Sequence, residues 1–214
     1  DTMTVTVLLS PTASFTVDSL LCQGDTVLVT YTGNAPPNAT YNWLFPGGNV
    51  LSGSGQGPYL IRYGSQGARA IKLTVSFGGC TSPQLIDSIW IDWRPVLNLQ
   101  AFNPRCFGDS TGLVNTNWYN GTLPVTYVWS TGDTTFNLHN LPAGTYSMTM
   151  TDAHGCVDSD VVTLVDPPEL TYQFAVDSFI CNGGTGTATI TPAGGTPAYS
   201  YLWSNAATTE DISA

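Results

Sequence analysis

Positive charge is almost absent from this sequence. Its 214 residues include five lysines and arginines against 15 aspartates and glutamates, which gives a formal net charge of −10. The single lysine is Lys72. Nucleic acids and anionic membrane surfaces are bound through clustered cationic side chains. The composition therefore argues against both classes of partner.

Long apolar runs and helical periodicity are also missing. No segment approaches the ~20 consecutive apolar residues of a membrane-spanning helix, so we expect no membrane insertion. What the chain has instead is a two-residue alternation of apolar and polar residues, as in 26–32, 70–77 and 145–152. Between such runs lie many of its 22 glycines and 14 prolines. This pattern is typical of short strands joined by turns, and it predicts an all-β protein.

The sequence repeats itself at a fixed spacing. The stretch GTLPVTYVWSTGDTT at 121–135 returns 74 residues later as GTPAYSYLWSNAATT at 195–209. Three opening cysteines, each with a glycine two positions later, precede a tryptophan by 21, 23 and 22 residues; the pairs are Cys22 and Trp43, Cys106 and Trp129, and Cys181 and Trp203. Two closing cysteines follow glycine in similar turns, at Cys80 and Cys156. Such repetition is typical of stacked modules and not of catalytic sites.

We interpret the chain as tandem immunoglobulin-like β-sandwich modules in an extended array. The expected boundaries are 1–10 for the last strand of a preceding module, 11–95 and 96–167 for two complete modules, and 168–214 for the truncated first part of a further one. Proline marks each junction and restricts the residue before it to extended geometry. The expected core aromatic residues are Trp43, Trp129, Trp203 and Tyr146, the last as a tyrosine corner.

The second and third modules resemble the SprB-type repeat of cell-surface adhesins of gliding Bacteroidota. The motifs that carry the resemblance are CFGDSTG from Cys106, GT from Gly121, YVWS from Tyr127, LPAGTY ending at Tyr146 and TDAHGC ending at Cys156. The first module is similar to a PKD domain, with YNWLFPGG at 41–48 where that family has a Trp-x-Phe-Gly-Asp-Gly run. The acidic residue of that run is absent here.

The resemblance implies a non-catalytic stalk segment of a very long adhesin, exported by type 9 secretion to the outer-membrane exterior of a Gram-negative bacterium. The implied partners are neighbouring modules of the same chain, a surface polysaccharide or other adhesion target, and the secretion and gliding machinery. The alternative is an accessory carbohydrate- or protein-binding module of a secreted hydrolase, where PKD domains also occur.

The cysteines predict disulfide bonds within each complete module. An even count per module in an oxidising compartment favours Cys22–Cys80 and Cys106–Cys156, and the partner of Cys181 is then expected beyond residue 214. Each bond would close a loop of about 50 residues and contribute about 4 kcal/mol in the loop-entropy model. Free buried thiols are the alternative, and zinc is disfavoured because no second cysteine or histidine stands at ligand spacing.

Catalytic and metal-binding patterns are scarce. We expect His139 and His154 to be solvated loop residues, because no nucleophile motif, phosphate loop or zinc-protease motif accompanies them. No cofactor is expected. Three aspartates, Asp152, Asp158 and Asp160, could supply oxygen ligands to Ca²⁺, although they lack a defined calcium loop; solvated or turn-capping carboxylates are the competing interpretation.

Aspartate is followed by serine or threonine unusually often. Eight of the 13 aspartates have such a neighbour. Six of these pairs are similar to the Asp-Ser/Thr-aliphatic sites of Bacteroidota O-glycosylation, with the acceptors Thr2, Ser19, Thr26, Ser88, Ser110 and Thr134. Because Asp-Ser and Asp-Thr pairs also start ordinary turns, both interpretations stay open.

Overall fold

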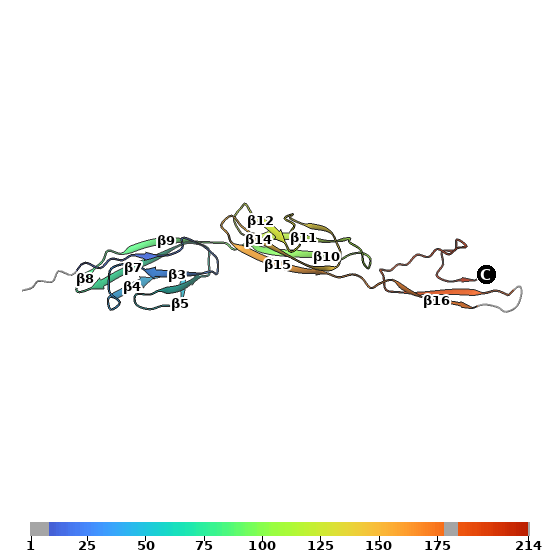
Figure 1. The fold of residues 1–214 in the computed structure, drawn as a ribbon, viewed down its shortest axis with the longest axis horizontal. Coiled ribbons are helices and arrows are strands. Elements are labelled where there is room, and N and C mark those ends of the chain that lie inside the picture. Colours follow the sequence, from blue (N-terminus) through green and yellow to red (C-terminus); the bar gives the residue numbers. More distant parts are fainter. Residues whose placement is uncertain (1–8, 178–183, 214) are drawn as a thin grey trace, which may run out of the picture. The chain divides into compact units, whose positions relative to one another are not determined.

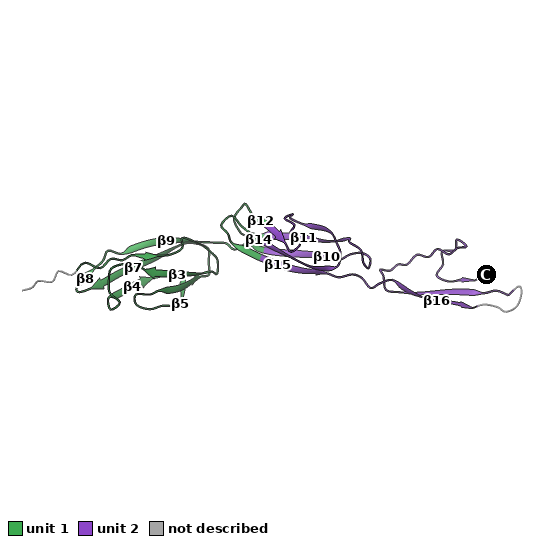
Figure 2. Ribbon diagram, viewed as in Figure 1, with its two compact units in different colours: residues 1–96, 119–126, 150–158 green, residues 97–118, 127–149, 159–214 purple. Residues whose placement is uncertain are grey.

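The computed structural model describes residues 9–177 and 184–213. Every regular element among them is a β-strand (Figure 1). The chain divides into two compact units (Figure 2). Unit 1 contains 1–96, 119–126 and 150–158, and unit 2 contains 97–118, 127–149 and 159–214. No described residue belongs to a helix that could span a membrane.

Residues 15–92 of unit 1 form two facing sheets. The first has the order β1-β3-β6-β5, and the second has the order β2-β9-β7-β4 with β8 paired to β7. The bounds are β1 Phe15–Thr16, β2 Leu20–Cys22, β3 Thr26–Tyr31, β4 Thr40–Leu44, β5 Gly48–Ser52, β6 Tyr59–Tyr63, β7 Gly67–Phe77, β8 Cys80–Thr81 and β9 Leu85–Asp92.

The alternation seen in the sequence produces the core between these sheets. Val27 and Val29 on β3 and Ile71, Leu73 and Val75 on β7 are fully buried, whereas the residues between them are more exposed. Successive side chains of a strand point to opposite faces. One face of each sheet is therefore apolar and packs against the other sheet.

Residues 96–164 form two three-stranded sheets, and three strands within 171–177 and 187–213 form a third. Their orders are β10-β11-β13, β12-β14-β15 and β16-β17-β18. The bounds are β10 Val96–Phe102, β11 Gly112–Tyr119, β12 Thr126–Trp129, β13 Leu138–Leu141, β14 Gly144–Thr151, β15 Val157–Leu164, β16 Thr171–Asp177, β17 Thr187–Ala193 and β18 Ile212–Ser213. β16 is exposed along its whole length.

The strand pairing and the compact units divide the chain differently. The described sheets fall within 15–92, 96–164 and 171–213. The first unit, however, includes 119–126 and 150–158 from the middle segment. The module boundaries at 95 and 167 therefore stay predictions.

The predicted core aromatic residues lie in different environments. Trp129 is 2% exposed and donates its indole N–H to the Thr135 carbonyl at 2.8 Å. Tyr146 is buried on β14 and donates its hydroxyl to the Pro142 carbonyl at 3.0 Å. Trp43 is half-buried and packs on the core of unit 1, with its ring centroid 5.3 Å from that of Phe15.

Trp203 is half-buried, with Phe174 as its aromatic neighbour at 6.1 Å. Its indole N–H donates to the Thr209 carbonyl at 2.8 Å. Trp129 makes the same bond to the carbonyl six residues later. The repeated sequence thus builds the same local loop twice.

Candidate functional site

A cluster of polar groups around two buried carboxylates lies at the end of β9 in unit 1. Asp92, the last residue of β9, is 6% exposed. Its Oδ1 accepts from the Trp93 N–H at 2.9 Å, and its Oδ2 accepts from the Thr122 hydroxyl at 3.1 Å and from His154 Nδ1. Burial alone would raise the pKa of Asp92, but the hydrogen bonds from His154, Thr122 and Trp93 outweigh it and hold that pKa below its ordinary value.

The loop that carries His154 is organised by a second buried carboxylate. Oδ1 of Asp152 accepts from the N–H groups of His154 and Cys156, both at 2.9 Å. Its Oδ2 accepts from the Thr122 N–H at 3.0 Å, and the Ala153 N–H returns a bond to the Thr122 carbonyl at 2.9 Å. Both oxygens of Asp152 are thus used to fix the loop that presents Cys156.

The disulfide bond of this cluster corrects the sequence prediction. The structure joins Cys22 to Cys156, with the Cα atoms 5.6 Å apart, in place of Cys22–Cys80 and Cys106–Cys156. Cys80 and Cys106 are free thiols. Cys181 lies outside the described residues.

Strand direction explains why Cys22 and Cys80 do not meet. Cys22 pairs with Asp92 at the end of β9, next to the start of β7, where Gly67 pairs with Ile91. Cys80 pairs with Phe77 at the other end of β7. Since β7 has 11 residues and a strand rises about 3.3 Å per residue, the two cysteines are roughly 30 Å apart, whereas a disulfide needs Cα atoms within about 7 Å.

Cys106 is separated from Cys156 in a similar way. Asn103 Oδ1, three residues before Cys106, accepts from the Val165 N–H just after β15. Cys156 stands at the opposite end, immediately before the first residue of β15. The full length of a strand therefore lies between the two positions.

An arginine adds three contacts beside the disulfide. The Arg94 guanidinium lies 2.5 Å from Asp25 Oδ1 and also donates to the Val157 carbonyl at 3.2 Å and the Gln23 carbonyl at 3.4 Å. The two charged side chains are about two-fifths exposed. Such half-exposed pairs contribute little by charge alone, so the arginine acts mainly by tying separate backbone segments together.

The side chains of this cluster connect separate segments of the chain. Thr122 and His154 both bind Asp92, and both Asp152 oxygens are taken by backbone N–H groups. Nothing in this set points to a nucleophile and base arrangement. Sequence reasoning missed Asp92, Arg94 and Thr122; the signal for Thr122 was its recurrence as Thr196 in the repeated stretch.

The other candidate ligands do not gather at one point. Asp160 is half-buried, with Oδ2 accepting from the Leu99 N–H at 2.8 Å, and Asp158 is also half-buried. No group of three or more metal-ligating side chains forms within 9–177 and 184–213. His139 is exposed on strand β13 instead of a loop. His154 is an exposed loop residue, as predicted, and its Nδ1 also bonds Asp92.

The predicted glycan acceptors that the structure describes are all exposed: Ser19, Thr26, Ser88, Ser110 and Thr134. Thr2 lies outside the described residues. Asp87 and Asp133, which precede two of them, accept backbone N–H groups from Ser88 at 2.8 Å and from Thr135 at 2.7 Å. Asp133 therefore acts as a turn residue, whereas Asp87 lies within strand β9, paired with Ile71.

Comparison with known families identifies the repeated part of the chain. Residues 174–208 match the family model of the SprB repeat. The chain therefore contains an SprB-type repeat. The matched segment includes all but the last residue of the second copy of the repeated stretch, 195–209, with Gly195, Thr196 and Trp203. No curated protein sequence matches the chain.

Solved structures show the fold of the chain that carries the SprB repeat. The N-terminal eight Ig domains of Down Syndrome Cell Adhesion Molecule align with a TM-score of 0.52 and 12% identity, over 86% of this chain and 28% of that chain. This chain thus spans well under a third of that structure. The fold is all-β and immunoglobulin-like.

Other tandem β-sandwich structures align less closely. A three-domain Ig fragment of titin has a TM-score of 0.37 and 10% identity, over 88% of this chain and 97% of that one. The fibronectin(III)-like modules of Clostridium thermocellum CbhA have a TM-score of 0.33 and 13% identity, over 72% and 94%. The SprB-repeat match, taken with the fold, supports a cell-surface, adhesin-like structural module.

Proposed function

We propose that this chain is a non-catalytic stalk segment of a very long secreted adhesin, of the gliding-motility type and exported by type 9 secretion to the exterior of the outer membrane. The observation that carries the proposal is the SprB-repeat match at 174–208. The Asp92 cluster supports it, because its polar groups bind other parts of the same chain. A chain that fastens its own distant segments is suited to transmit position and force.

The stalk proposal is tested in the cells that make the protein. Deleting the coding segment for 96–214 should reduce adhesion to surfaces and gliding, while antibodies to the remaining chain still label intact cells. Replacing the deleted segment with an unrelated three-domain Ig fragment of similar length should restore both if the segment acts as a spacer. Loss of a hydrolytic activity on deletion would instead favour an accessory module of a hydrolase.

We also propose that the stalk surface is O-glycosylated at the aspartate-flanked hydroxyls. The support is the exposure of all five described acceptors. Peptides from the native protein that contain Ser19, Ser88 or Thr134 should carry hexose masses, whereas Asp-to-Asn variants at the preceding residue should lose them. Unmodified native peptides would contradict this proposal.

A further inference from the structure

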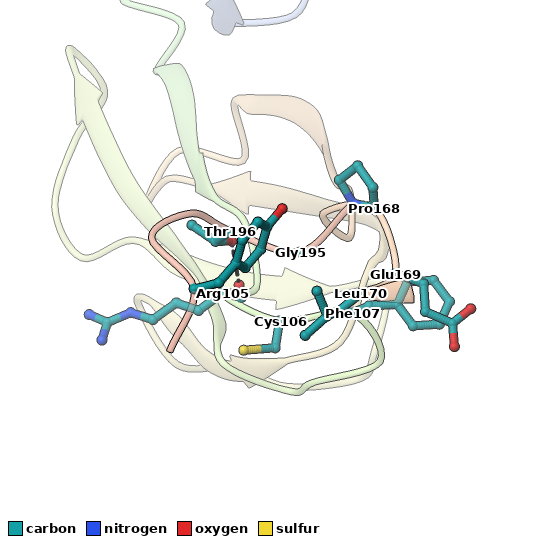
Figure 3. Close-up of a pocket in the computed structure, with 9 residues that line it drawn as sticks. Arg105, Cys106, Phe107, Pro168, Glu169, Leu170, Gly195 and Thr196 are labelled. Atoms are coloured by element: carbon teal, nitrogen blue, oxygen red, sulfur yellow. Dashed lines mark hydrogen bonds between the residues drawn. The ribbon is translucent and has the colours of Figure 1, made fainter. Parts of the chain in front are cut away.

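A cavity of about 390 Å³ lies beside a free thiol in unit 2. The thiol belongs to Cys106, which follows β10 and is exposed. The cavity is also lined by residues that precede β16 or follow β17: Pro168, Glu169, Leu170, Gly195, Thr196 and Tyr199. Figure 3 shows the Cys106 sulfur between the side chains of Arg105 and Glu169, whose charged ends point away to opposite sides of the view. The cavity therefore presents a free thiol, and Arg105 and Glu169 are among the residues that line it.

The turn that carries Cys106 has the conformation of the turn that carries Cys22. In each Cys-x-Gly-Asp segment the aspartate N–H donates to the cysteine carbonyl, at 3.0 Å in the Cys22 turn and 3.2 Å in the Cys106 turn. The glycine is left-handed in both, with φ of 86° at Gly24 and 74° at Gly108, a conformation that glycine adopts at no steric cost. Cys106 thus begins a turn of the same geometry as the one that follows the bonded Cys22, although Cys22 ends strand β2 and Cys106 lies outside any strand.

The wall of the cavity also corresponds to the surroundings of Cys22. Gly195 repeats Gly121, and each is followed by a threonine and has a positive φ, 63° and 79°. A Cβ placed on Gly121 would lie 3.0 Å from Pro95 Cβ, and one on Gly195 would lie 3.3 Å from Leu170 Cβ. Pro95 directly precedes β10 and Leu170 directly precedes β16. The two sites therefore share these parts, although the Thr122 hydroxyl donates to Asp92 and the Thr196 hydroxyl donates to the Arg105 carbonyl.

One part of the first site is missing from the second. In unit 1 the loop 152–156 lies on Thr122 and brings Cys156 to Cys22. Among the described residues, no loop occupies the corresponding position beside Cys106, and the cavity lies at that position. At the 74-residue offset of the repeat, the matching loop falls after residue 214.

We propose that Cys106 forms a disulfide with the closing cysteine of the next SprB-type repeat, whose Gly-Cys turn occupies this cavity. Disulfides of the array are then staggered, each opening cysteine bonding to the closing cysteine one module further along. By the same rule Cys80, the closing cysteine of the first module, bonds the opening cysteine of a preceding module. Gly79 before it and Gly155 before Cys156 share a φ of 81°. The proposal rests on the proposed function, because it requires consecutive repeats.

Formation of the bond needs a disulfide oxidant, such as oxidised glutathione. The Cys106 thiolate attacks one sulfur of the oxidant, forming a mixed disulfide and releasing one thiolate. The closing cysteine thiolate then attacks the Cys106 sulfur and releases the second thiolate. Two cysteine thiols are oxidised, the oxidant is reduced to two thiols, and the two protons go to the released thiolates.

The Arg94 ion pair of the first site has no counterpart in the second. Arg94, which pairs with Asp25, stands one residue before Pro95, and the residue in that position before Leu170 is Glu169. An acidic side chain cannot pair with Asp109, the counterpart of Asp25. Binding of the closing turn in the cavity therefore depends on Cys106 and on the contact surface at Gly195 and Thr196, and not on an ion pair.

A chain extended by its own closing segment tests the proposal. Residue 214 corresponds to residue 140, so appending a copy of 141–167 after 214 supplies the closing strands and a second TDAHGC turn. The extended chain is oxidised with glutathione, digested without reduction and mapped by peptide mass. We expect a peptide pair joining Cys106 to the appended copy of Cys156, and the same pair in a Cys181→Ser variant.

Two outcomes overturn the staggered pattern. One is a bond from Cys181 to the appended cysteine, which is the pairing within a module; the other is a free Cys106 in a chain that has formed Cys22–Cys156. The readout is peptide mass alone, so its failure leaves the adhesion and gliding test of the stalk proposal standing.

A second measurement on the unextended chain covers the case in which the extension does not fold. A synthetic peptide of residues 150–158, activated at its cysteine as a thionitrobenzoate disulfide, should react at Cys106 faster than at Cys80. Replacing its Asp152 by alanine removes acceptors that fix the turn, a change of about 1.4 kcal/mol, and should slow the reaction at Cys106 about tenfold. Equal reaction rates for the two peptides would contradict the proposed binding of the turn in the cavity.

Discussion

At the scale of single residues, the side chain of Asp152 accepts three backbone N–H groups. A short carboxylate side chain can accept bonds from the backbone two and four residues later, and Asp152 does so while also reaching Thr122. Because Asp152 is buried, water cannot replace it when it is removed. Its position in the sequence suggested a turn or calcium ligand, and its contacts are those of a turn residue.

We predict that Asp152→Ala lowers the free energy of unfolding by about 2 kcal/mol or more, since three backbone N–H groups lose their acceptor. Chemical denaturation followed by tryptophan fluorescence measures the change. Asp18→Ala at an exposed position is the matched control and should change stability by less than about 0.5 kcal/mol. Equal effects at the two positions would contradict the role given to Asp152.

The second residue-scale prediction concerns pH. The pKa of Asp92 is lowered in the folded protein, so its contribution to stability is complete above the ordinary aspartate pKa of about 4. That contribution is lost as pH falls through the lowered pKa, where both folded and unfolded forms become protonated. The stability difference between the native chain and Asp92→Asn should therefore shrink between pH 7 and about pH 3. A difference that stays constant on acidification would show that the carboxylate charge is not the cause.

At the scale of elements, the two-residue period predicted strands well. The alternating run 70–77 lies inside β7, and 145–152 overlaps all but the first residue of β14. The short strand β13, which carries His139, was missed because four residues are too few to show a period. The all-β, immunoglobulin-like class was predicted because the pattern repeats over the whole chain.

The disulfide could not be predicted from cysteine counts. Between Cys22 and Cys80 the chain runs through five strands, β3 to β7. Each strand carries the chain from one end of the sandwich to the other. Because the number of strands is odd, the two cysteines lie at opposite ends. The sequence shows that strands alternate with turns, but the exact strand number depends on short elements that it does not resolve, and the pairing depends on that number.

An element-scale prediction concerns the loop after β3. Tyr31, the last residue of β3, donates its hydroxyl to the Thr12 carbonyl at 2.8 Å, and a Cβ on Gly33 would lie 2.2 Å from that hydroxyl and 2.4 Å from the carbonyl. Gly33→Ala should therefore destabilise unit 1 by about 1–3 kcal/mol through overpacking. Gly64→Ala, where a Cβ meets nothing within 4 Å, is the control. Thermal unfolding distinguishes them, and a neutral Gly33→Ala would mean that the loop moves freely.

At the scale of the whole molecule, the Cys22–Cys156 bond closes a loop across 134 residues of sequence. In the loop-entropy model a loop of this length stabilises the folded state by about 5 kcal/mol. The bond joins segments from the first and second predicted modules, so neither module by itself contains it. The stabilisation by this bond therefore requires both segments in one chain.

We predict that Cys22→Ser lowers the midpoint of thermal unfolding strongly, whereas Cys80→Ser, at a free thiol, leaves it nearly unchanged. Non-reducing peptide maps should show Cys22 linked to Cys156 in the native chain and in Cys80→Ser. A map with Cys22 linked to Cys80 would overturn the structure at this point and restore the pairing within a module.

The same bond sets how far the chain can be drawn out under tension. If the two ends are pulled apart, the disulfide carries the force between Cys22 and Cys156. The 134 residues between them therefore cannot be extended, even after every strand has unfolded. At about 3.4 Å per extended residue, these residues correspond to roughly 450 Å of chain length. The reduced chain gains this length on unfolding under force, and the oxidised chain does not. Stretching single molecules in an optical trap, before and after adding a reductant, would show this length as one step, and a row of staggered bonds would make the whole fibre nearly inextensible.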